Sequence, residues 1–381
     1  MKDALPINIE VLIWARESLG LTIEEVSLKI KRTEKEIKEW ESGKSSPTYP
    51  QLEKLAYNIY KRPIAVFFFP NIPHEETPKT DFRTLPEAIV DKLPVELIKL
   101  YRKAKVFQFN LAELLEDLKP ISPNLIDNYS LSNTSEINSL AKAIRSEIGI
   151  KIEDQFSWQS LDFAFKKWRN AFESKGIFVF KDAFYNDDYS GFCVYDESYP
   201  IIYINNSMPS SRQIFTLFHE LGHLLYHLGG IDFRDNRIIE RTSRKYQLYE
   251  RNCNKFANEI LVPLDVFRLQ DLPVSEKNIK GLADKFSVSR EVILRNYLET
   301  GLIDNDYYKK MVKKWAKEAE KSRKDLKGGN YYYNQIAYLG NTYIDLVFRK
   351  YYQNRITIEN LSNYLNIKES NISSFEHYAF G

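Results

Sequence analysis

The spacing of apolar residues predicts that most of this chain is helical. Five short stretches with helical spacing lie between residues 8 and 69, separated by polar turns. Longer amphipathic stretches follow at residues 95–119, 135–148, 158–174 and about 211–228, and further helical patterns run from residue 279 to residue 365. Each stretch places its apolar residues on one side, so we expect helices that pack through one face.

Three short apolar segments interrupt this pattern and indicate strands. They are residues 176–180, 190–195 and 200–205, each of a length that suits a strand. The last two are separated by a short polar turn, which favours an antiparallel hairpin. The predicted fold class is therefore α+β and mostly helical, with a small antiparallel sheet.

Proline and turn residues suggest how the chain divides. Residues 1–70 form the first predicted domain, with five helices, and the proline-rich residues 71–94 are expected to be an extended linker. Residues 95–270 contain the predicted strands, and residues 271–381 form a helical C-terminal region.

Composition and charge exclude several classes of protein. No run of about 20 apolar residues is present, so no membrane-spanning helix is expected. The first residues lack the apolar core of a signal peptide, and two cysteines do not make a disulfide scaffold, so we expect a cytoplasmic protein. The net charge of +2 predicts no strong general attraction to nucleic acid.

The candidate chemistry begins with His219, Glu220 and His223, which form an H-E-x-x-H pattern inside a predicted helix. Residues four apart lie on one face of a helix, so both imidazoles can bind a single ion. Zinc prefers such nitrogen ligands, and a catalytic zinc site keeps one position open for water. Glu220 would lie beside that water as a general base. The alternative is a helix with two histidines satisfied by ordinary packing.

A second predicted helix, residues 250–263, supplies a third ligand candidate. Glu250 completes a two-histidine, one-glutamate set, and Asn254 could orient a ligand from the second shell. The alternative for Glu250 is a surface carboxylate at the start of a helix. Cys253 is either a competing ligand or a small buried residue.

The two segments together resemble the ImmA/IrrE family of metallo-endopeptidases. The resemblance lies in H-E-L-G-H-L-L-x-H followed by a glutamate helix that reads N-x-F-A-x-x-I-L-x-P. It implies a zincin-like peptidase domain, with His219, His223 and Glu250 as metal ligands and Glu220 as catalytic base. The implied cofactor is Zn²⁺, with Mn²⁺ as an alternative. Tyr203, or a residue of a predicted mobile flap at 231–246, is a candidate for stabilising the oxyanion.

Residues 1–70 resemble the helix-turn-helix domain of XRE-type (Cro/repressor-like) regulators. The resemblance rests on L-T-x-x-E and on W-E-x-G-K-x-x-P-T at the end of the third helix, which would enter the DNA major groove. Its candidate DNA contacts are Lys35, Lys38 and Lys44. Four glutamates share the same helix, and carboxylates that face phosphates weaken binding. The domain is therefore either a DNA reader or a module for protein contacts.

The combined interpretation is a zinc-dependent endopeptidase fused to a helix-turn-helix domain. The resemblance implies a protein substrate, such as a helix-turn-helix repressor whose cleavage relieves repression in a stress response or a mobile element. DNA contact through residues 1–70 or the basic helix at 306–327, and a homodimer, are also compatible with the sequence, whereas a membrane partner is not expected. The alternatives are a DNA-binding regulator with a sensory or structural metal site, and a toxin–antitoxin or phage-defence component.

Overall fold

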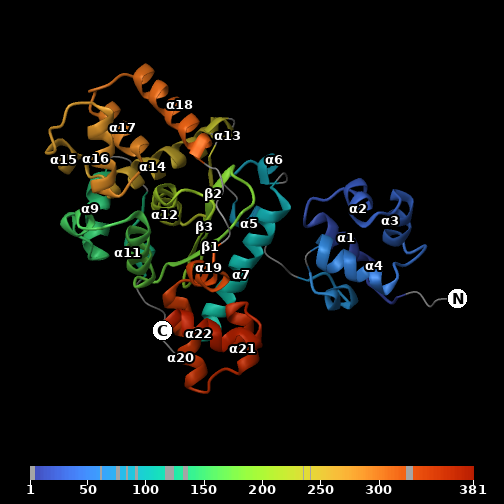
Figure 1. The fold of residues 1–381 in the computed structure, drawn as a ribbon. Helices are drawn as coiled ribbons and strands as arrows, with labels where there is room; N and C mark the ends of the chain where they lie inside the picture. The colour runs from blue at the N-terminus through green and yellow to red at the C-terminus, as the bar shows by residue number, and fades with distance from the viewer. Residues whose placement is uncertain are drawn as a thin grey trace. The chain divides into compact units, whose positions relative to one another are not determined.

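The computed structural model describes residues 5–60, 62–73, 78–82, 85–90, 93–115, 124–131, 136–234, 236–240, 242–322 and 329–381. The chain forms two compact units, Met1–Arg102 and Lys103–Gly381 (Figure 1). The predicted class is confirmed, because helices predominate and the described strands form one small sheet.

The first unit contains the expected helices of the N-terminal domain. They are α1 (Ile9–Glu17), α2 (Ile23–Ile30), α3 (Glu34–Glu41), α4 (Tyr49–Glu53), the π-helix η1 (Lys54–Tyr60) and the 3₁₀-helix η2 (Ile64–Phe68). Thr22 and Thr33 begin α2 and α3 with capping boxes, in which the threonine hydroxyl and a glutamate three residues later satisfy free amide groups. The predicted fourth helix corresponds to α4 and the π-helix η1 that continues it, and the predicted fifth helix corresponds to the 3₁₀-helix η2.

A partly buried ion pair joins α1 to α3 inside this unit. The Arg16 guanidinium donates to both oxygens of Glu41, at 2.7 Å from Nε and 3.0 Å from a terminal nitrogen. Val11, Ile37 and Trp40 are buried in the same core. Glu41 therefore serves the fold of the domain and is not part of the exposed face of α3.

The segment expected to be an extended linker contains two short helices. They are α5 (Pro78–Asp81) and α6 (Glu87–Val90), and α7 (Val95–Leu115) follows them. Phe82 is 1% exposed and packs edge-on against Tyr101 at a ring distance of 5.6 Å. The described part of this segment therefore forms short helices with a buried aromatic residue, whereas the sequence predicted an extended linker.

The sheet of the second unit is mixed and has four strands in the order β1-β3-β2-β4. The strands are β1 (Phe178–Asp182), β2 (Tyr189–Val194), β3 (Ile201–Asn205) and β4 (Gly230–Phe233). β2 and β3 pair antiparallel, as the predicted hairpin requires, whereas β1 pairs parallel with β3. The sequence predicted a small antiparallel sheet, and the parallel pairing of β1 with β3 makes the sheet mixed.

The edge strand β4 was not predicted. It pairs antiparallel with β2, and α13 (Asn236–Glu240) and the start of α14 (Arg244–Leu261) follow it. Together these elements occupy the described part of residues 231–246, where the sequence suggested a mobile flap. The ladder to β2 satisfies the backbone of β4, so its residues are part of the sheet.

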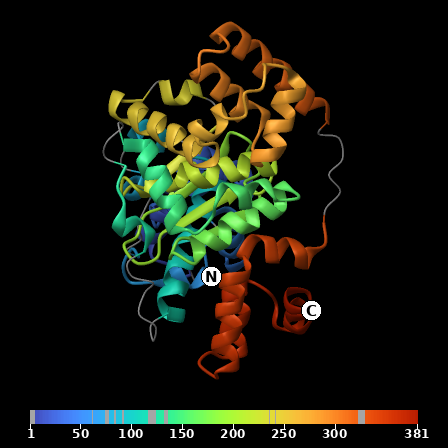
Figure 2. The same cartoon turned by 90° about the vertical axis from the view of Figure 1, so that its left-hand side faces the viewer.

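Helices cover the sheet and extend the second unit. The remaining elements are α8 (Leu125–Asn128), α9 (Ile137–Glu147), α10 (Ile152–Phe156), α11 (Leu161–Glu173), α12 (Ser210–Leu224), α15 (Leu264–Arg268), α16 (Glu276–Phe286), α17 (Arg290–Glu299), α18 (Asn305–Ser322), α19 (Tyr331–Leu339), α20 (Asn341–Tyr352), α21 (Ile358–Leu365), η4 (Glu369–Asn371) and α22 (Ile372–Phe380). Both views place α16–α18 and α20–α22 at opposite ends of this unit (Figure 2).

The two faces of the sheet pack against different partners. Cys193, Ile202 and Ile204 belong to the main core with α12, α11 and α14. Tyr203 and Phe192, which alternate with them, stack on each other at 5.1 Å. This alternation fixes which strand residues can reach α12. Among the described residues, no helix is long and apolar enough to cross a membrane.

Candidate metal centre

The helix α12 carries His219, Glu220 and His223. It begins after Pro209, and apolar residues such as Ile214 and Leu221 are completely buried in the core. Burial of this stripe fixes the rotation of α12, so His219 and His223 face the same side one turn apart.

The helix α14 brings Glu250 to the same place. Its packing against α12 is unusually close at Gly222, where an added Cβ would lie 3.0–3.1 Å from three atoms of Cys253. Any larger residue at 222 would push the two helices apart. Gly222 therefore permits the approach that joins a ligand from α14 to two ligands from α12.

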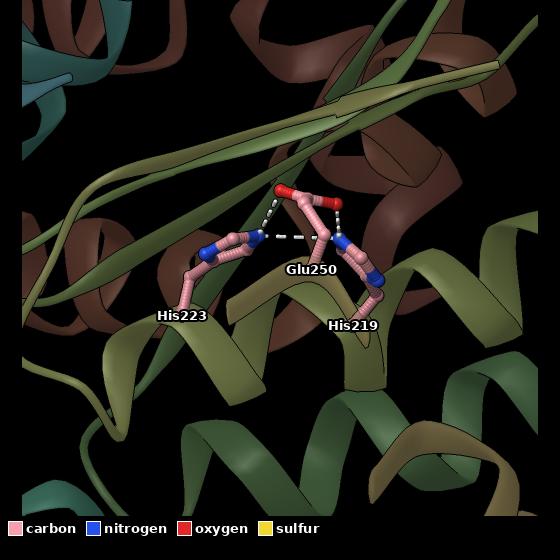
Figure 3. Close-up of side chains that lie close together, drawn as sticks. All are labelled: His219, His223 and Glu250. Carbon is pink, nitrogen blue, oxygen red and sulfur yellow. Dashed lines mark hydrogen bonds and ion pairs between the residues drawn. The ribbon is translucent and has the colours of Figure 1, made fainter. Parts of the chain in front are cut away.

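The three side chains converge on one point (Figure 3). His219 Nε2 lies 3.2 Å from His223 Nε2 and 3.3 Å from Glu250 Oε2, and His223 Nε2 lies 3.2 Å from Glu250 Oε1. Metal–ligand bonds of ~2.0–2.1 Å in a tetrahedral site put ligand atoms about 3.3 Å apart. The three donors thus have the separation that one tetrahedral ion requires.

The electrostatics of this cluster favour a cation. Burial would raise the pKa of Glu250, but the two imidazoles hold it well below its usual range. Both Glu250 oxygens face imidazole nitrogens and form no regular hydrogen bond with a described residue. An ionised, buried carboxylate without such bonds is costly unless it is paired or binds a metal. The donor set and its burial therefore fit a metal ion.

Asn254 contacts the candidate ligand His219 at the ring nitrogen that faces away from the cluster. Its Oδ1 lies 3.2 Å from Nδ1 of His219. When His219 donates a proton from Nδ1 to this oxygen, the lone pair of Nε2 points into the cluster. The structure thus brings the residue singled out for the second shell into contact with its ligand.

Glu220 adjoins the cluster and is 0% exposed. Neither of its carboxylate oxygens has a hydrogen-bond partner among the described residues. Burial raises the pKa of Glu220 to about 8. A raised pKa makes the ionised form of Glu220 a stronger base, which favours transfer of a proton from water to its carboxylate.

The Cys253 thiol is not brought into the cluster. It is completely buried against Gly222, and burial raises its pKa well above the usual value. A neutral thiol is a poor metal ligand because the thiolate is the form that binds. Of the two interpretations of Cys253, the structure favours the small buried residue.

The structure does not bring Tyr203, the candidate for stabilising the oxyanion, to the metal centre. Its ring lies on the face of the sheet opposite to Ile202 and Ile204, which pack towards α12. Its hydroxyl is 3.4 Å from Asp182 Oδ2. Period-two alternation along β3 therefore directs Tyr203 away from the reaction site.

A polar network between α12 and β4 was missed by the sequence analysis. Arg212 donates to both oxygens of Asp232 at 2.8 Å, and the Thr216 hydroxyl donates to Asp232 at 2.8 Å. This network fixes β4 beside the histidines. The signal for it was the helical spacing of Arg212 and Thr216, but their partner lies on the strand that was not predicted.

The backbone of β4 touches the second histidine. An added Cβ at Gly230 would lie 2.4 Å from Cγ of His223 and 2.5 Å from Cδ2. Only a glycine lets the strand pass this close to the imidazole.

We expect Gly230→Ala to displace either β4 or the His223 ring. The predicted cost is about 1–3 kcal/mol in the free energy of unfolding, as for other overpacked sites. Zinc affinity should fall as well, because the ring is a candidate ligand. Denaturant titration and zinc titration of the full chain would measure both effects.

Gly281→Ala is the matched control for that experiment. Gly281 lies inside α16, and an added Cβ there meets no atom within 4 Å. Alanine should stabilise the helix by roughly 0.5–1 kcal/mol and leave metal binding unchanged. Equal behaviour of the two variants would show that the contact with His223 has no effect.

In the N-terminal unit, the three candidate lysines are all exposed, but two are paired. Lys38 lies 3.1 Å from Glu34, and Lys35 lies 3.9 Å from Glu39, both within α3. Lys44 follows the helix. The exposed face of α3 therefore presents lysines whose charge is partly cancelled by neighbouring glutamates.

The cluster of two histidines and one glutamate, with a carboxylate adjacent in sequence, is the donor set found in hydrolytic zinc sites. Comparison with protein families identifies each part. The peptidase family described as the IrrE N-terminal-like domain matches residues 172–297, and a helix-turn-helix family matches residues 12–56. No curated protein matches the chain. The chain thus contains one segment that is similar to a helix-turn-helix family and a second segment that is similar to the IrrE-like peptidase family.

Proposed function

We propose that this protein is a zinc-dependent endopeptidase that cleaves a partner transcriptional repressor. The observation that carries this proposal is the His219–His223–Glu250 set at ligand-like separations, with Glu220 beside it, inside a segment that matches a peptidase family. The chemistry of the donors suits Zn²⁺, and Mn²⁺ is the second candidate.

The residues of the chain have distinct parts in this mechanism. A zinc ion held by His219, His223 and Glu250 would activate water and polarise the scissile carbonyl. Glu220 accepts a proton from the attacking water at a carboxylate oxygen and returns it to the leaving amine nitrogen. Asn254 keeps the His219 ring in the orientation and tautomer that metal binding requires.

The nature of the partner is inferred from the N-terminal domain. Because ion pairs within α3 cancel much of its positive charge, the domain is better suited to contacts with another protein than to phosphates. A repressor with its own helix-turn-helix domain is the class of partner that we propose. Cleavage in the cytoplasm would then relieve repression.

Mapping of new protein N-termini tests the proposed cleavage. Cells of the native host would produce either the wild-type chain or Glu220→Gln, and newly exposed amino groups would be tagged and identified by mass spectrometry. We expect cleavage within a helix-turn-helix repressor only with the wild-type chain and only with metal available. Identical sets of new N-termini in both cells would refute the endopeptidase proposal and favour a regulator that acts by binding.

DNA binding by the whole chain should be weak and sensitive to salt. We expect Kd values of ~10⁻⁴–10⁻⁶ M at physiological salt, typical of non-specific binding, because the lysines of α3 already have carboxylate partners. Removing those partners with Glu34→Gln and Glu39→Gln should strengthen binding and steepen its salt dependence. Fluorescence anisotropy with labelled duplex DNA would measure this, and tight sequence-specific binding by the wild-type chain would contradict it.

A further inference from the structure

Tyr246 lies in the first turn of α14, and its buried side chain interacts with Glu250. The Ser243 hydroxyl accepts a hydrogen bond from the Tyr246 amide at 3.2 Å, which fixes the start of the helix. Tyr246 precedes Glu250 by four residues, so both occupy one face of α14. The Tyr246 side chain is 1% exposed, and its hydroxyl lies beside the Glu250 carboxylate.

The Tyr246 hydroxyl contacts the Glu250 carboxylate but forms no hydrogen bond of regular geometry with a described residue. Other buried tyrosines in this unit are satisfied: Tyr297 donates to the Leu272 carbonyl at 2.9 Å, and Tyr343 donates to the Tyr364 carbonyl at 3.3 Å. An unsatisfied hydroxyl in a buried position is unfavourable, so it is rarely retained without a use. The missing partner of Tyr246 points to a ligand.

The charges around the hydroxyl define what that ligand can be. A phenol hydroxyl can donate one hydrogen bond, and the oxygens of the neighbouring Glu250 can only accept. Glu250 directs its two oxygens to the imidazoles of His219 and His223. The phenol is therefore a donor beside the metal site, available to an oxygen that does not belong to the protein.

We propose that the Tyr246 hydroxyl donates a hydrogen bond to the carbonyl oxygen of the scissile peptide bond as that oxygen becomes an oxyanion. This proposal rests on the proposed endopeptidase function. It assigns the oxyanion donor to α14, whereas Tyr203 lies on the far face of the sheet.

The reaction step balances without transfer of the tyrosine proton. The water oxygen forms a bond to the carbonyl carbon, the π electron pair moves to the carbonyl oxygen, and Glu220 takes the water proton. Tyr246 stabilises the negative oxygen by its hydrogen bond. The electron pair then re-forms the carbonyl, the C–N bond breaks, and the nitrogen takes the proton from Glu220. Tyr246 ends the step as it began.

Tyr246→Phe tests this assignment because it removes the hydroxyl and keeps the ring. The substrate would be a fluorogenic peptide that spans the bond found by mapping new N-termini, with the zinc-loaded full chain as enzyme. Loss of one oxyanion donor typically lowers kcat by ~10²–10³-fold. We expect that loss in kcat with little change in KM. A phosphinic analogue of the same peptide, which mimics the tetrahedral oxyanion, should bind more weakly by a similar factor.

Metal binding supplies the readout that separates a donor from a merely structural residue. Zinc stoichiometry, and the visible absorption of the cobalt-substituted protein, should be the same in Tyr246→Phe and in the wild type. Tyr249→Phe is the matched control, because Tyr249 lies on the same helix and packs against Tyr226 at 4.5 Å. It should keep the wild-type kcat and the wild-type affinity for the phosphinic analogue.

The outcomes distinguish this inference from the function on which it rests. Wild-type kcat in Tyr246→Phe, or a loss of zinc from it, would overturn the oxyanion assignment while cleavage by the wild-type chain stands. Absence of cleavage by the zinc-loaded wild-type chain would overturn both. A selective fall in kcat, with zinc retained, supports Tyr246 as the donor.

Discussion

Glu220→Gln should abolish peptide cleavage while leaving the metal site and the fold intact. Glutamine has the same shape as glutamate, and the side chain is completely buried, so packing against its neighbours is kept. What disappears is the basic carboxylate, and loss of a general base typically costs ~10²–10⁴-fold in rate. Glu220 adjoins a candidate ligand in sequence but is not part of the convergent set.

Three measurements on the same preparation would check this result: zinc content by elemental analysis, thermal unfolding, and the rate of repressor cleavage. Derepression in cells should disappear together with cleavage. A Glu220→Gln chain that still relieves repression at the wild-type level would show that the protein acts by binding, and the regulator interpretation would replace the peptidase.

His223→Ala should remove the metal. Purified wild-type chain is expected to carry about one zinc or manganese ion, held by three side chains of which His223 is one. Mutating a residue that merely orients a ligand typically costs ~10–100-fold in metal affinity, so loss of a ligand should cost more. Elemental analysis of chain purified in metal-limited buffer would measure the occupancy.

His227→Ala is the control for that experiment. His227 lies beyond the end of α12, where its Nε2 is 3.2 Å from the Ile126 carbonyl, and it does not join the candidate ligands. We expect His227→Ala to retain its metal. Full occupancy in His223→Ala would overturn the ligand assignment, and loss of metal from both variants would point to damage of the fold.

The sequence predicted those parts of the structure that depend on local periodicity and on short-range chemistry. The β2–β3 hairpin and the helix that carries His219 and His223 are both read from residues a few positions apart. Within α12, helical spacing alone places both histidines on one face.

Contacts between distant segments could not be read in this way. β4 has four residues and gains its definition from pairing with β2, about forty positions earlier. All five residues of β3 are buried, so alternation of polar and apolar residues gave no sign of which face Tyr203 would take. Tyr246 was inside the segment considered for the oxyanion, but its direction depends on α14 starting at Arg244, before the predicted residue 250.

The burial of the cluster has a consequence for how a peptidase of this design is switched. His219, Glu220, His223 and Glu250 are each at most 2% exposed, so any opening that a substrate needs in order to reach them would add its free energy to the barrier of the reaction. Turnover then scales with the population of an open state, and each ~1.4 kcal/mol of opening free energy lowers the apparent rate tenfold. A partner that binds the open state more tightly raises activity without touching a single ligand. The apparent rate of cleavage would thus be set by the equilibrium between the closed and the open conformation, while the chemistry at the metal stays the same.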